Sequence, residues 1–183
     1  RFRLKPALAP KRLPATEKQV SSKQRISEIF LDESGVVRRS PRVEHEHKVA
    51  IYDLLQNNYF HPIGPAGDGG GGLEGPYVLH LSIVENRLIF DIRDQKDKAL
   101  AKFALPLSPL RSIVRDYFMI CDSYFKAIKT SAPSRIEAID MGRRGVHNEG
   151  GELLRELLAG KVEIDDHTTR RLFTLICVLH IKA

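Results

Sequence analysis

The chain has 183 residues, and its 29 lysines and arginines against 23 aspartates and glutamates give a formal net charge of +6 at pH 7. Residues 1–25 hold eight of the basic residues and one acidic residue, which leaves 21 basic and 22 acidic residues in residues 26–183. A uniformly cationic nucleic-acid-binding domain is therefore excluded. A membrane helix is excluded too, because the longest apolar run, residues 172–181, falls short of the roughly 20 residues that such a helix needs.

The N-terminal 25 residues predict a disordered basic tail. They combine a net charge of +7 with three prolines and show no apolar period. One interpretation is a solvated tail without a role of its own. The other is a tether for RNA or for an acidic partner, because clustered cations gain affinity by releasing counterions from phosphates.

Regular structure is expected from Ile26 onward. Residues 26–31 are rich in branched and aromatic side chains, which predicts a strand. Ser40 and Pro41 then predict a helix start, with serine as the N-cap and proline at the first helical position. Apolar side chains at helical spacing extend this helix to about residue 57.

Residues 61–76 predict a flexible loop because of their glycine run. Gly67, Gly69 and Gly72 formally match the G-x-G-x-x-G motif of dinucleotide-binding proteins. That motif requires a strand before it and a helix after it, whereas Pro76 and a strand follow here. We therefore predict a flexible linker rather than a dinucleotide site.

Three alternating strands follow the loop. Apolar side chains alternate along residues 77–83, 88–92 and 99–105, with turn residues between them. This pattern predicts an antiparallel meander with one buried face. Since parallel βαβ repeats are missing, the predicted class is α+β, an antiparallel three- or four-stranded sheet packed against several α-helices in one domain over residues 26–183.

The rest of the chain predicts helices. A wide apolar stripe over residues 110–128 predicts the central core helix, packed on the sheet. Ser134 predicts the start of a shorter helix that ends within residues 142–145, and Asn148 predicts the cap of the next. Either aspartate of residues 165–166 can cap the last helix.

The two cysteines predict a reducing compartment. Cys121 and Cys177 both lie in apolar stretches, and two cysteines make no disulfide framework. The paired spacings of a zinc site are missing, and the N-terminus has no apolar segment typical of a secretory signal. We therefore expect a cytoplasmic protein without a metal or another cofactor.

Five long segments carry a resemblance to a known family. They are Val37–Glu46, Ala50–Leu55, Asp116–Cys121, Ile136–Gly150 and Arg170–Leu179. In sequence and order they resemble the bacterial Uncharacterised Protein Family 0262, over about residues 26–183. The resemblance implies a small bacterial cytoplasmic protein, and it transfers no catalytic residue.

The strongest candidate site lies in residues 140–151. Arg143 and Arg144 supply planar, permanently charged donors suited to phosphate or carboxylate. They precede the predicted turn and the helix start at Asn148, where free N–H groups favour anions. The alternative is a plain connection between two helices whose arginines pair with local acids.

His147 is the candidate acid or base if the protein is an enzyme, because the ordinary pKa of a histidine lies near neutral pH. Asp140 or Glu149 would orient it. No nucleophile-elbow pattern accompanies these residues, so a serine hydrolase is not expected.

Two further arginine groups are candidates for binding. Arg38, Arg39 and Arg42 lie at the start of the first helix, where cations oppose the helix dipole. Either acidic side chains or a bound anion would compensate their charge. Arg170 and Arg171 would add a third cation pair, for which surface salt bridges are the favoured explanation.

The leading hypothesis is a non-enzymatic domain that binds a phosphorylated small molecule or a protein partner through Arg143 and Arg144, together with Arg38, Arg39 and Arg42. The competing hypothesis is a small hydrolase or transferase that acts on a phosphorylated metabolite, with His147 as acid or base. A third hypothesis is a structural or interaction module whose basic tail contacts RNA. An enzyme requires His147, an orienting acid and at least one arginine to line one concave pocket. Arginine clusters on opposite faces, or arginines held in internal ion pairs, would weaken both hypotheses of anion binding. The ligand and the oligomeric state are left open.

Overall fold

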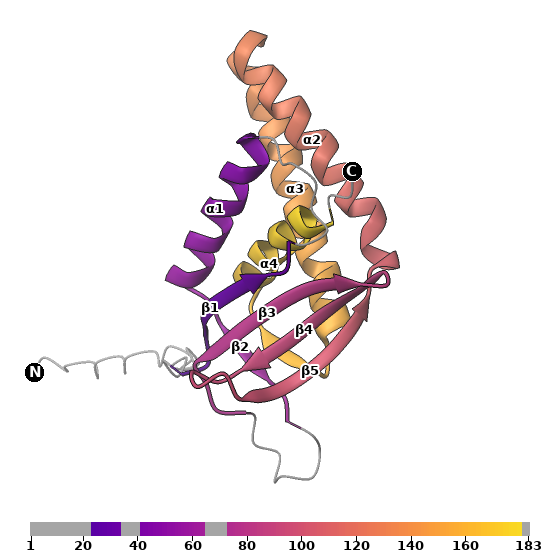
Figure 1. Cartoon of the computed structure of the whole chain (residues 1–183). Helices are drawn as coiled ribbons and strands as arrows, with labels where there is room; N and C mark the ends of the chain where they lie inside the picture. The colour runs from indigo at the N-terminus through magenta and orange to yellow at the C-terminus, as the bar shows by residue number, and fades with distance from the viewer. Residues whose placement is uncertain (1–22, 34–40, 65–72, 181–183) are drawn as a thin grey trace, which may run out of the picture.

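The computed structural model describes residues 23–33, 41–64 and 73–180, and every structural statement below concerns these ranges. In chain order they form β1 (Ile26–Leu31), α1 (Pro41–Gln56), β2 (Phe60–Pro62), β3 (Tyr77–Val84), β4 (Arg87–Arg93), β5 (Ala99–Pro106), the 3-10 turn η1 (Ser108–Leu110), α2 (Arg111–Thr130), α3 (Pro133–Leu158), β6 (Val162–Ile164) and α4 (Asp166–Leu179). The predicted α+β class is confirmed, with helices gathered on one side of a sheet (Figure 1).

The main sheet has four strands in the order β1-β3-β4-β5. The predicted meander is confirmed, because β3, β4 and β5 pair antiparallel, with Leu81 opposite Phe90 and Phe90 opposite Phe103. β1 differs from the antiparallel expectation, since it pairs parallel to β3 with Phe30 opposite His80. Alternation along a strand marks its buried face but not its neighbour's direction. The intervening α1 and β2 supply the long connection that a parallel pair needs.

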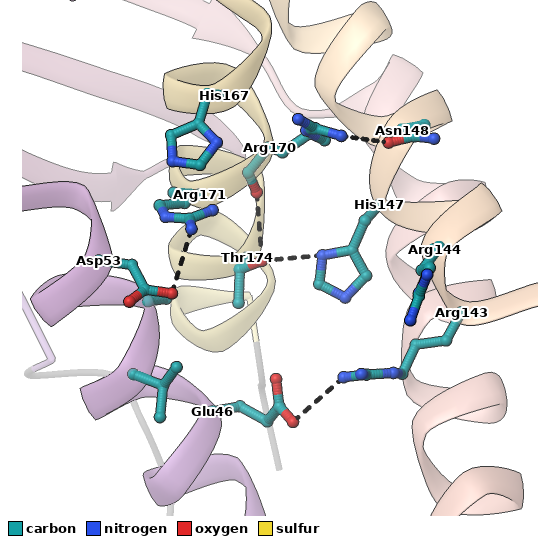
Figure 2. A pocket seen from close by; sticks show the side chains of 12 residues that line it. Glu46, Asp53, Arg143, Arg144, His147, Asn148, His167, Arg170, Arg171 and Thr174 are labelled. Carbon is teal, nitrogen blue, oxygen red and sulfur yellow. Dashed lines mark hydrogen bonds and ion pairs between the residues drawn. The ribbon is translucent and has the colours of Figure 1, made fainter. Parts of the chain in front are cut away.

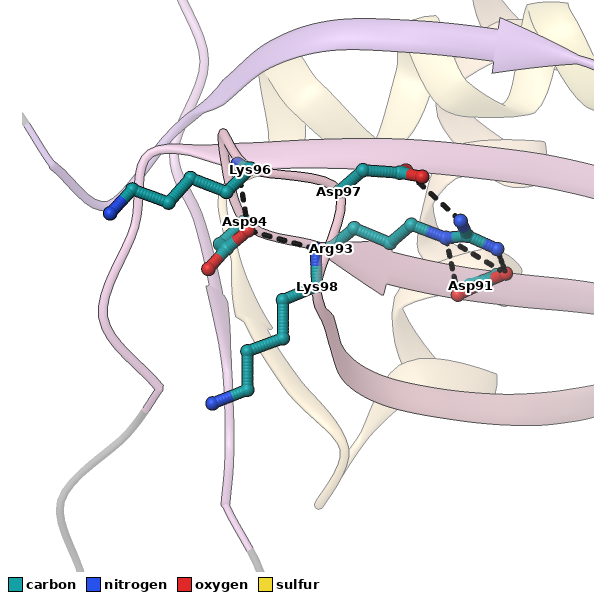
Figure 3. A network of polar contacts seen from close by, with 6 residues as sticks. All are labelled: Asp91, Arg93, Asp94, Lys96, Asp97 and Lys98. Carbon is teal, nitrogen blue, oxygen red and sulfur yellow. Dashed lines mark hydrogen bonds and ion pairs between the residues drawn. The ribbon is translucent and has the colours of Figure 1, made fainter.

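A charged network closes the predicted turn between β4 and β5 (Figure 3). Arg93 lies between two carboxylates, with Nη2 2.8 Å from Oδ2 of Asp91 and Nη1 2.9 Å from Oδ1 of Asp97. Asp94 accepts a hydrogen bond from the backbone N–H of Lys98, and this bond holds the pKa of Asp94 below its usual range. These contacts stabilise the turn, so the cluster has a structural explanation.

A second, two-stranded sheet lies at the start of the predicted loop. β2 pairs antiparallel with β6, with His61 opposite Glu163. Three residues are too few to show alternation, so the sequence predicts neither strand. His61 and Pro62 therefore lie in a strand, while the glycine run over residues 65–72 falls outside the described part of the chain.

α3 differs most from the sequence prediction. The sequence predicts two helices separated at residues 142–145, with Asn148 capping the second, but α3 is one helix of 26 residues. The predicted caps are wrong as well, because the N-cap is Ala132 and Pro133 opens the helix without a side-chain capping bond. No helix begins at Asn148, so the free N–H groups expected there are used inside α3.

Two buried glycines explain why α3 continues. A Cβ atom built on Gly150 would lie 2.4 Å from the ring of Phe173, and one on Gly151 would lie 2.8 Å from Cγ of Arg170. Both glycines therefore allow α3 to approach α4 closely. The apolar burial gained at this contact outweighs the poor helix propensity of glycine.

α4 occupies the centre of the fold. Ten of its fourteen residues are buried, whereas α2 buries five of its twenty. α2 packs on α3, and the two form a hairpin that extends beyond the sheet (Figure 1). The prediction of α2 as the central helix is therefore wrong. An apolar stripe shows that one face of a helix is buried, but it does not show which element packs against that face. None of the helices in the described ranges is long and apolar enough to cross a membrane.

Asp165→Ala is expected to destabilise the protein by about 1 kcal/mol. The predicted cap of α4 is confirmed, because Oδ1 of Asp165 accepts a hydrogen bond from the backbone N–H of Thr168 at 2.7 Å. Urea unfolding followed by circular dichroism measures the change. Asp165→Asn retains a capping oxygen and should unfold at nearly the wild-type urea concentration; equal loss in both variants would contradict the capping role.

Candidate functional site

A pocket of about 510 Å³ lies between α1 and α3, with α4 between them (Figure 2). Each of the three helices contributes four residues to its lining. They are Glu46, Val49, Ala50 and Asp53 from α1, Arg143, Arg144, His147 and Asn148 from α3, and His167, Arg170, Arg171 and Thr174 from α4. This volume is typical of small-molecule sites.

Helical spacing brings these side chains to the pocket. On α1 and on α4 the lining residues recur at i, i+3, i+4 and i+7, which is one face of a helix. On α3 they form two adjacent pairs one turn apart. The other faces of α3 and α4 pack into the core through apolar side chains and glycines. The polar faces are therefore left to line the pocket.

Arg143 connects two walls of the pocket. Its Nη2 lies 3.0 Å from Oδ1 of Asp140 on α3, and its Nη1 lies 3.5 Å from Oε1 of Glu46 on α1. The guanidinium also stacks on the ring of Tyr124, 4.8 Å from its centroid. The hydrogen bond from Arg143 holds the pKa of Asp140 below its usual range. Arg143 is thus positioned by two carboxylates and a ring.

A second ion pair joins α4 to α1. Nη2 of Arg171 lies 3.1 Å from Oδ2 of Asp53, and the side chain of Arg171 is largely buried. Its Nε is buried and has no hydrogen-bond partner among the described residues. Arg171 therefore retains one buried donor that Asp53 does not satisfy.

Arg144 and Arg170 are less engaged with carboxylates. Arg144 has a side chain that is 76% exposed, and its Nη2 lies 2.9 Å from Asp140, which it shares with Arg143. Arg170 donates to Oδ1 of Asn148 at 2.9 Å rather than to an acid. Most N–H groups of these two guanidiniums are therefore available to a ligand.

His147 lies inside the pocket wall as a neutral side chain. Its Nδ1 lies 3.2 Å from Oγ1 of Thr174, and the same hydroxyl lies 3.2 Å from the carbonyl oxygen of Arg170. The hydroxyl has one proton, so both bonds form when Thr174 donates to that carbonyl and accepts from Nδ1–H of His147. Burial, with the nearby charges of Arg143 and Arg170, lowers the pKa of His147 to about 4.

The other predicted residues fall in different places. Asn148 lines the pocket as a hydrogen-bond acceptor for Arg170 instead of capping a helix. Asp140 stands beside the pocket and pairs with its arginines, whereas Glu149 is exposed and outside the lining. Neither acid accepts a hydrogen bond from His147, whose Nδ1–H donates to Thr174 instead. The catalytic role of His147, Asp140 and Glu149 stays a prediction.

The arginines at the start of α1 do not join this pocket. Arg42 lies over the ring of Phe125, 4.7 Å from its centroid, and lines a separate cavity of about 440 Å³ with Phe118 and Cys121. Arg38 and Arg39 lie outside the described residues. The second arginine cluster therefore contributes no described side chain to the main pocket.

The cysteines are both buried and reduced, as free thiols. Burial raises the pKa of Cys121 to about 11 and that of Cys177 well above its usual value. Both thiols are therefore protonated at neutral pH, which leaves no thiolate nucleophile.

Sequence reasoning does not assign four polar residues of the lining to this site: Glu46, Asp53, His167 and Thr174. On α4 the polar side chains at i, i+3, i+4 and i+7 are the signal that could have found His167 and Thr174. On α1 only the residues at i and i+7, Glu46 and Asp53, are polar, so the signal there is weaker. Arg170 and Arg171 are noticed in the sequence, but surface salt bridges were the favoured explanation. The structure places them in the same pocket as Arg143 and Arg144.

The chain is similar to a set of bacterial proteins along nearly its whole length. A UPF0262 protein of Rhodospirillum rubrum is 57% identical over 166 residues, which cover 91% of this chain and 98% of the relative. One from Paramagnetospirillum magneticum is 56% identical over 160 residues, covering 87% and 98%, and one from Brucella canis is 56% identical over 156 residues, covering 85% and 93%. No solved structure is significantly similar.

The family model described as "Uncharacterised protein family (UPF0262)" matches residues 23–182. This range contains every residue that lines the pocket, and it leaves out most of the basic tail. The resemblance inferred from the sequence segments is confirmed: the chain belongs to the UPF0262 family.

Proposed function

We propose that the pocket between α1, α3 and α4 binds a small ligand that carries a phosphate group. The observation that carries this proposal is the convergence of four arginines from two helices on one concave pocket. The lining holds four arginines and two carboxylates, and burial lowers the pKa of both its histidines. With neutral histidines the lining has a net formal charge of +2, which favours an anion.

Within this pocket we assign phosphate contact to Arg144 and Arg170. Arg143 and Arg171 already pair with carboxylates of α1, whereas Arg144 shares one acid and Arg170 pairs with an amide. A guanidinium presents its N–H groups in a planar fork that matches two phosphate oxygens. The paired arginines then hold the walls in place and add positive potential.

The pocket supports a small molecule better than a protein partner, because its lining is concave and of ligand size. The hydrolase or transferase alternative has less support. It needs an acid that orients His147, but Nδ1–H of His147 donates to the hydroxyl of Thr174 rather than to a carboxylate. RNA contact through residues 1–25 and a cytoplasmic location are separate predictions that the pocket does not address.

Arg170→Ala and Arg144→Ala are expected to weaken phosphate binding by roughly 10- to 100-fold each, the value of a charge-assisted hydrogen bond. A thermal-shift screen with inorganic phosphate and phosphorylated metabolites identifies a binding compound, and calorimetry of the wild type and variants then gives the affinities.

Arg111→Ala is the matched control for Arg170→Ala. Arg111 also donates to an asparagine, with Nη2 2.8 Å from Oδ1 of Asn86, but it lies at the start of α2, outside the pocket lining. We expect the Arg111→Ala variant to bind the same compound with the affinity of the wild type. The proposal fails if no phosphorylated compound binds, or if both pocket variants bind it as tightly as the control does.

A further inference from the structure

Apart from its arginines, the pocket presents mainly hydrogen-bonding groups. Its remaining polar lining residues are Glu46, Asp53, His147, Asn148, His167 and Thr174. The apolar lining residues are Val49 and Ala50, both on α1. A ligand that fills this pocket therefore meets cationic donors on α3 and α4 and oxygen or nitrogen acceptors nearby.

The described residues of the lining include no phenylalanine or tyrosine, and the chain has no tryptophan. Proteins bind nucleobases largely by stacking them on aromatic rings, a contact worth about 1–3 kcal/mol per base. Tyr117, which packs edge-on against the ring of His147 at 5.2 Å, belongs to the buried core and does not line the pocket. The lining therefore disfavours a nucleotide and suits a ligand without an aromatic group.

Two buried atoms at the pocket lack hydrogen-bond partners among the described residues. They are Nε2 of His147 and Nε of Arg171. Because Nδ1 of His147 carries the proton that Thr174 accepts, Nε2 is an unprotonated acceptor. A buried acceptor without a partner costs about 1–3 kcal/mol, so a ligand that satisfies it gains affinity.

Figure 2 shows the ring of His147 between Thr174 and the guanidinium of Arg143. Nε2 is covered in this structure, so a ligand group reaches it only after a small shift of the pocket wall. The longest of the ion pairs of Arg143 is the one with Glu46, in which Nη1 lies 3.5 Å from Oε1. This is the contact that a shift of Arg143 would break first, while Arg144 and Arg170 bind the phosphate.

We infer that the ligand is a phosphorylated polyol: a phosphate monoester of a small, hydroxyl-bearing, non-aromatic carbon skeleton. Its phosphate contacts Arg144 and Arg170, and one of its hydroxyl groups donates a hydrogen bond to Nε2 of His147. The inference rests on the proposed function, because it identifies the ligand class of the same pocket. It requires only non-covalent contacts. In this arrangement His147 distinguishes ligands that carry a hydroxyl group from ligands that do not.

The test compares matched ligands on the full chain by calorimetry. Glycerol phosphate and propyl phosphate carry the same monoester, but only the first has hydroxyl groups. We expect glycerol phosphate to bind about tenfold more tightly, the value of one well-made neutral hydrogen bond. We also expect adenosine monophosphate to bind more weakly than glycerol phosphate.

His147→Phe removes the acceptor and keeps a ring against Tyr117. In this variant the preference for glycerol phosphate over propyl phosphate should disappear. His80→Phe is the matched control, because Nε2 of His80 is also buried without a partner among the described residues, but on the sheet, where the ring stacks on Phe30. The preference should persist in that variant.

The possible outcomes separate the two proposals. Equal affinity of the wild type for glycerol phosphate and propyl phosphate overturns the polyol inference, even if Arg170→Ala shows that phosphate binds. Tighter binding of adenosine monophosphate overturns it as well. Absence of binding by any of the three compounds, together with a negative phosphate screen, overturns the proposed function itself. The wild-type comparison needs no variant and so remains decisive if His147→Phe does not fold.

Discussion

Gly150→Ala is expected to destabilise the protein by about 1–3 kcal/mol, the usual cost of forcing an extra group into a packed core. Alanine normally stabilises a helix interior relative to glycine, so the sign of this effect comes from packing alone. The new Cβ atom would lie 2.4 Å from two ring carbons of Phe173. That ring is fully buried and packs edge-on against Tyr117, which leaves it little room to move.

Gly145→Ala is the control for this prediction, because Gly145 lies in the same helix and a Cβ atom there meets nothing within 4 Å. We expect it to stabilise the protein by up to about 1 kcal/mol. Urea unfolding followed by circular dichroism measures both variants. If Gly150→Ala were as stable as Gly145→Ala, the close contact of α3 and α4 would be contradicted, and with it the arrangement of the pocket.

Asn58→Ala is expected to destabilise the protein by roughly 2–4 kcal/mol, because buried polar groups would lose their partner. Asn58 is buried just after α1, and its Oδ1 accepts from the backbone N–H of Ile26 at 2.7 Å. Its Nδ2 donates to the carbonyl oxygens of Ile26 at 3.0 Å and Leu54 at 2.8 Å. One side chain thus joins β1 to the end of α1.

The neighbouring Asn57 supplies the control, because its side chain is exposed. Asn57→Ala should change the free energy of unfolding by less than about 0.5 kcal/mol, as surface substitutions usually do. Chemical unfolding of both variants distinguishes the two positions. Equal stability of Asn58→Ala and the wild type would show that β1 is held in the sheet by other contacts.

The continuity of α3 changes the physical basis of the proposed site. A helix start at Asn148 would have offered free N–H groups and the positive end of a helix dipole to an anion. Inside a continuous helix these N–H groups bond to carbonyl oxygens, so positive charge must come from side chains. α4 provides it by adding Arg170 and Arg171 to the arginines of α3.

The carboxylates of α1 neutralise part of the positive charge of the four lining arginines. Glu46 and Asp53 lie on one face of α1, two turns apart at i and i+7, and each pairs with an arginine from another helix. These carboxylates keep the net charge of the lining modest while the guanidiniums are held in place. The arginines that remain available, Arg144 and Arg170, are therefore the ones whose removal should affect ligand binding most.

Local patterns in the sequence predict much of the fold. Strict alternation predicts β3, β4 and β5, and the aspartate pair at residues 165–166 predicts the cap of α4, which Asp165 makes. The strand β1 and the extent of α1 also follow from local patterns. These features depend on which side of an element is apolar and on which side chain can satisfy a free N–H, and both are properties of neighbouring residues.

The family segments and the arginines at Arg143 and Arg144 were likewise visible in the sequence, and so was the division between a basic tail and a nearly neutral remainder. Because residues 26–183 are nearly neutral, the net charge of +6 does not describe them, and local arginine groups are the better indication of a site. Which of these groups share a pocket depends on how the helices pack.

Only the tertiary structure decided the direction of β1, the continuity of α3, the central place of α4 and the composition of the pocket. Each depends on contacts between residues far apart in the chain. Gly150 breaks a helix by its own propensity, yet it is required where Phe173 packs against it. In the same way the sequence around Arg171 is typical of a surface cation, whereas in the fold Arg171 is largely buried and pairs with Asp53 of α1. Propensity is a local quantity, and burial against a distant partner outweighs it.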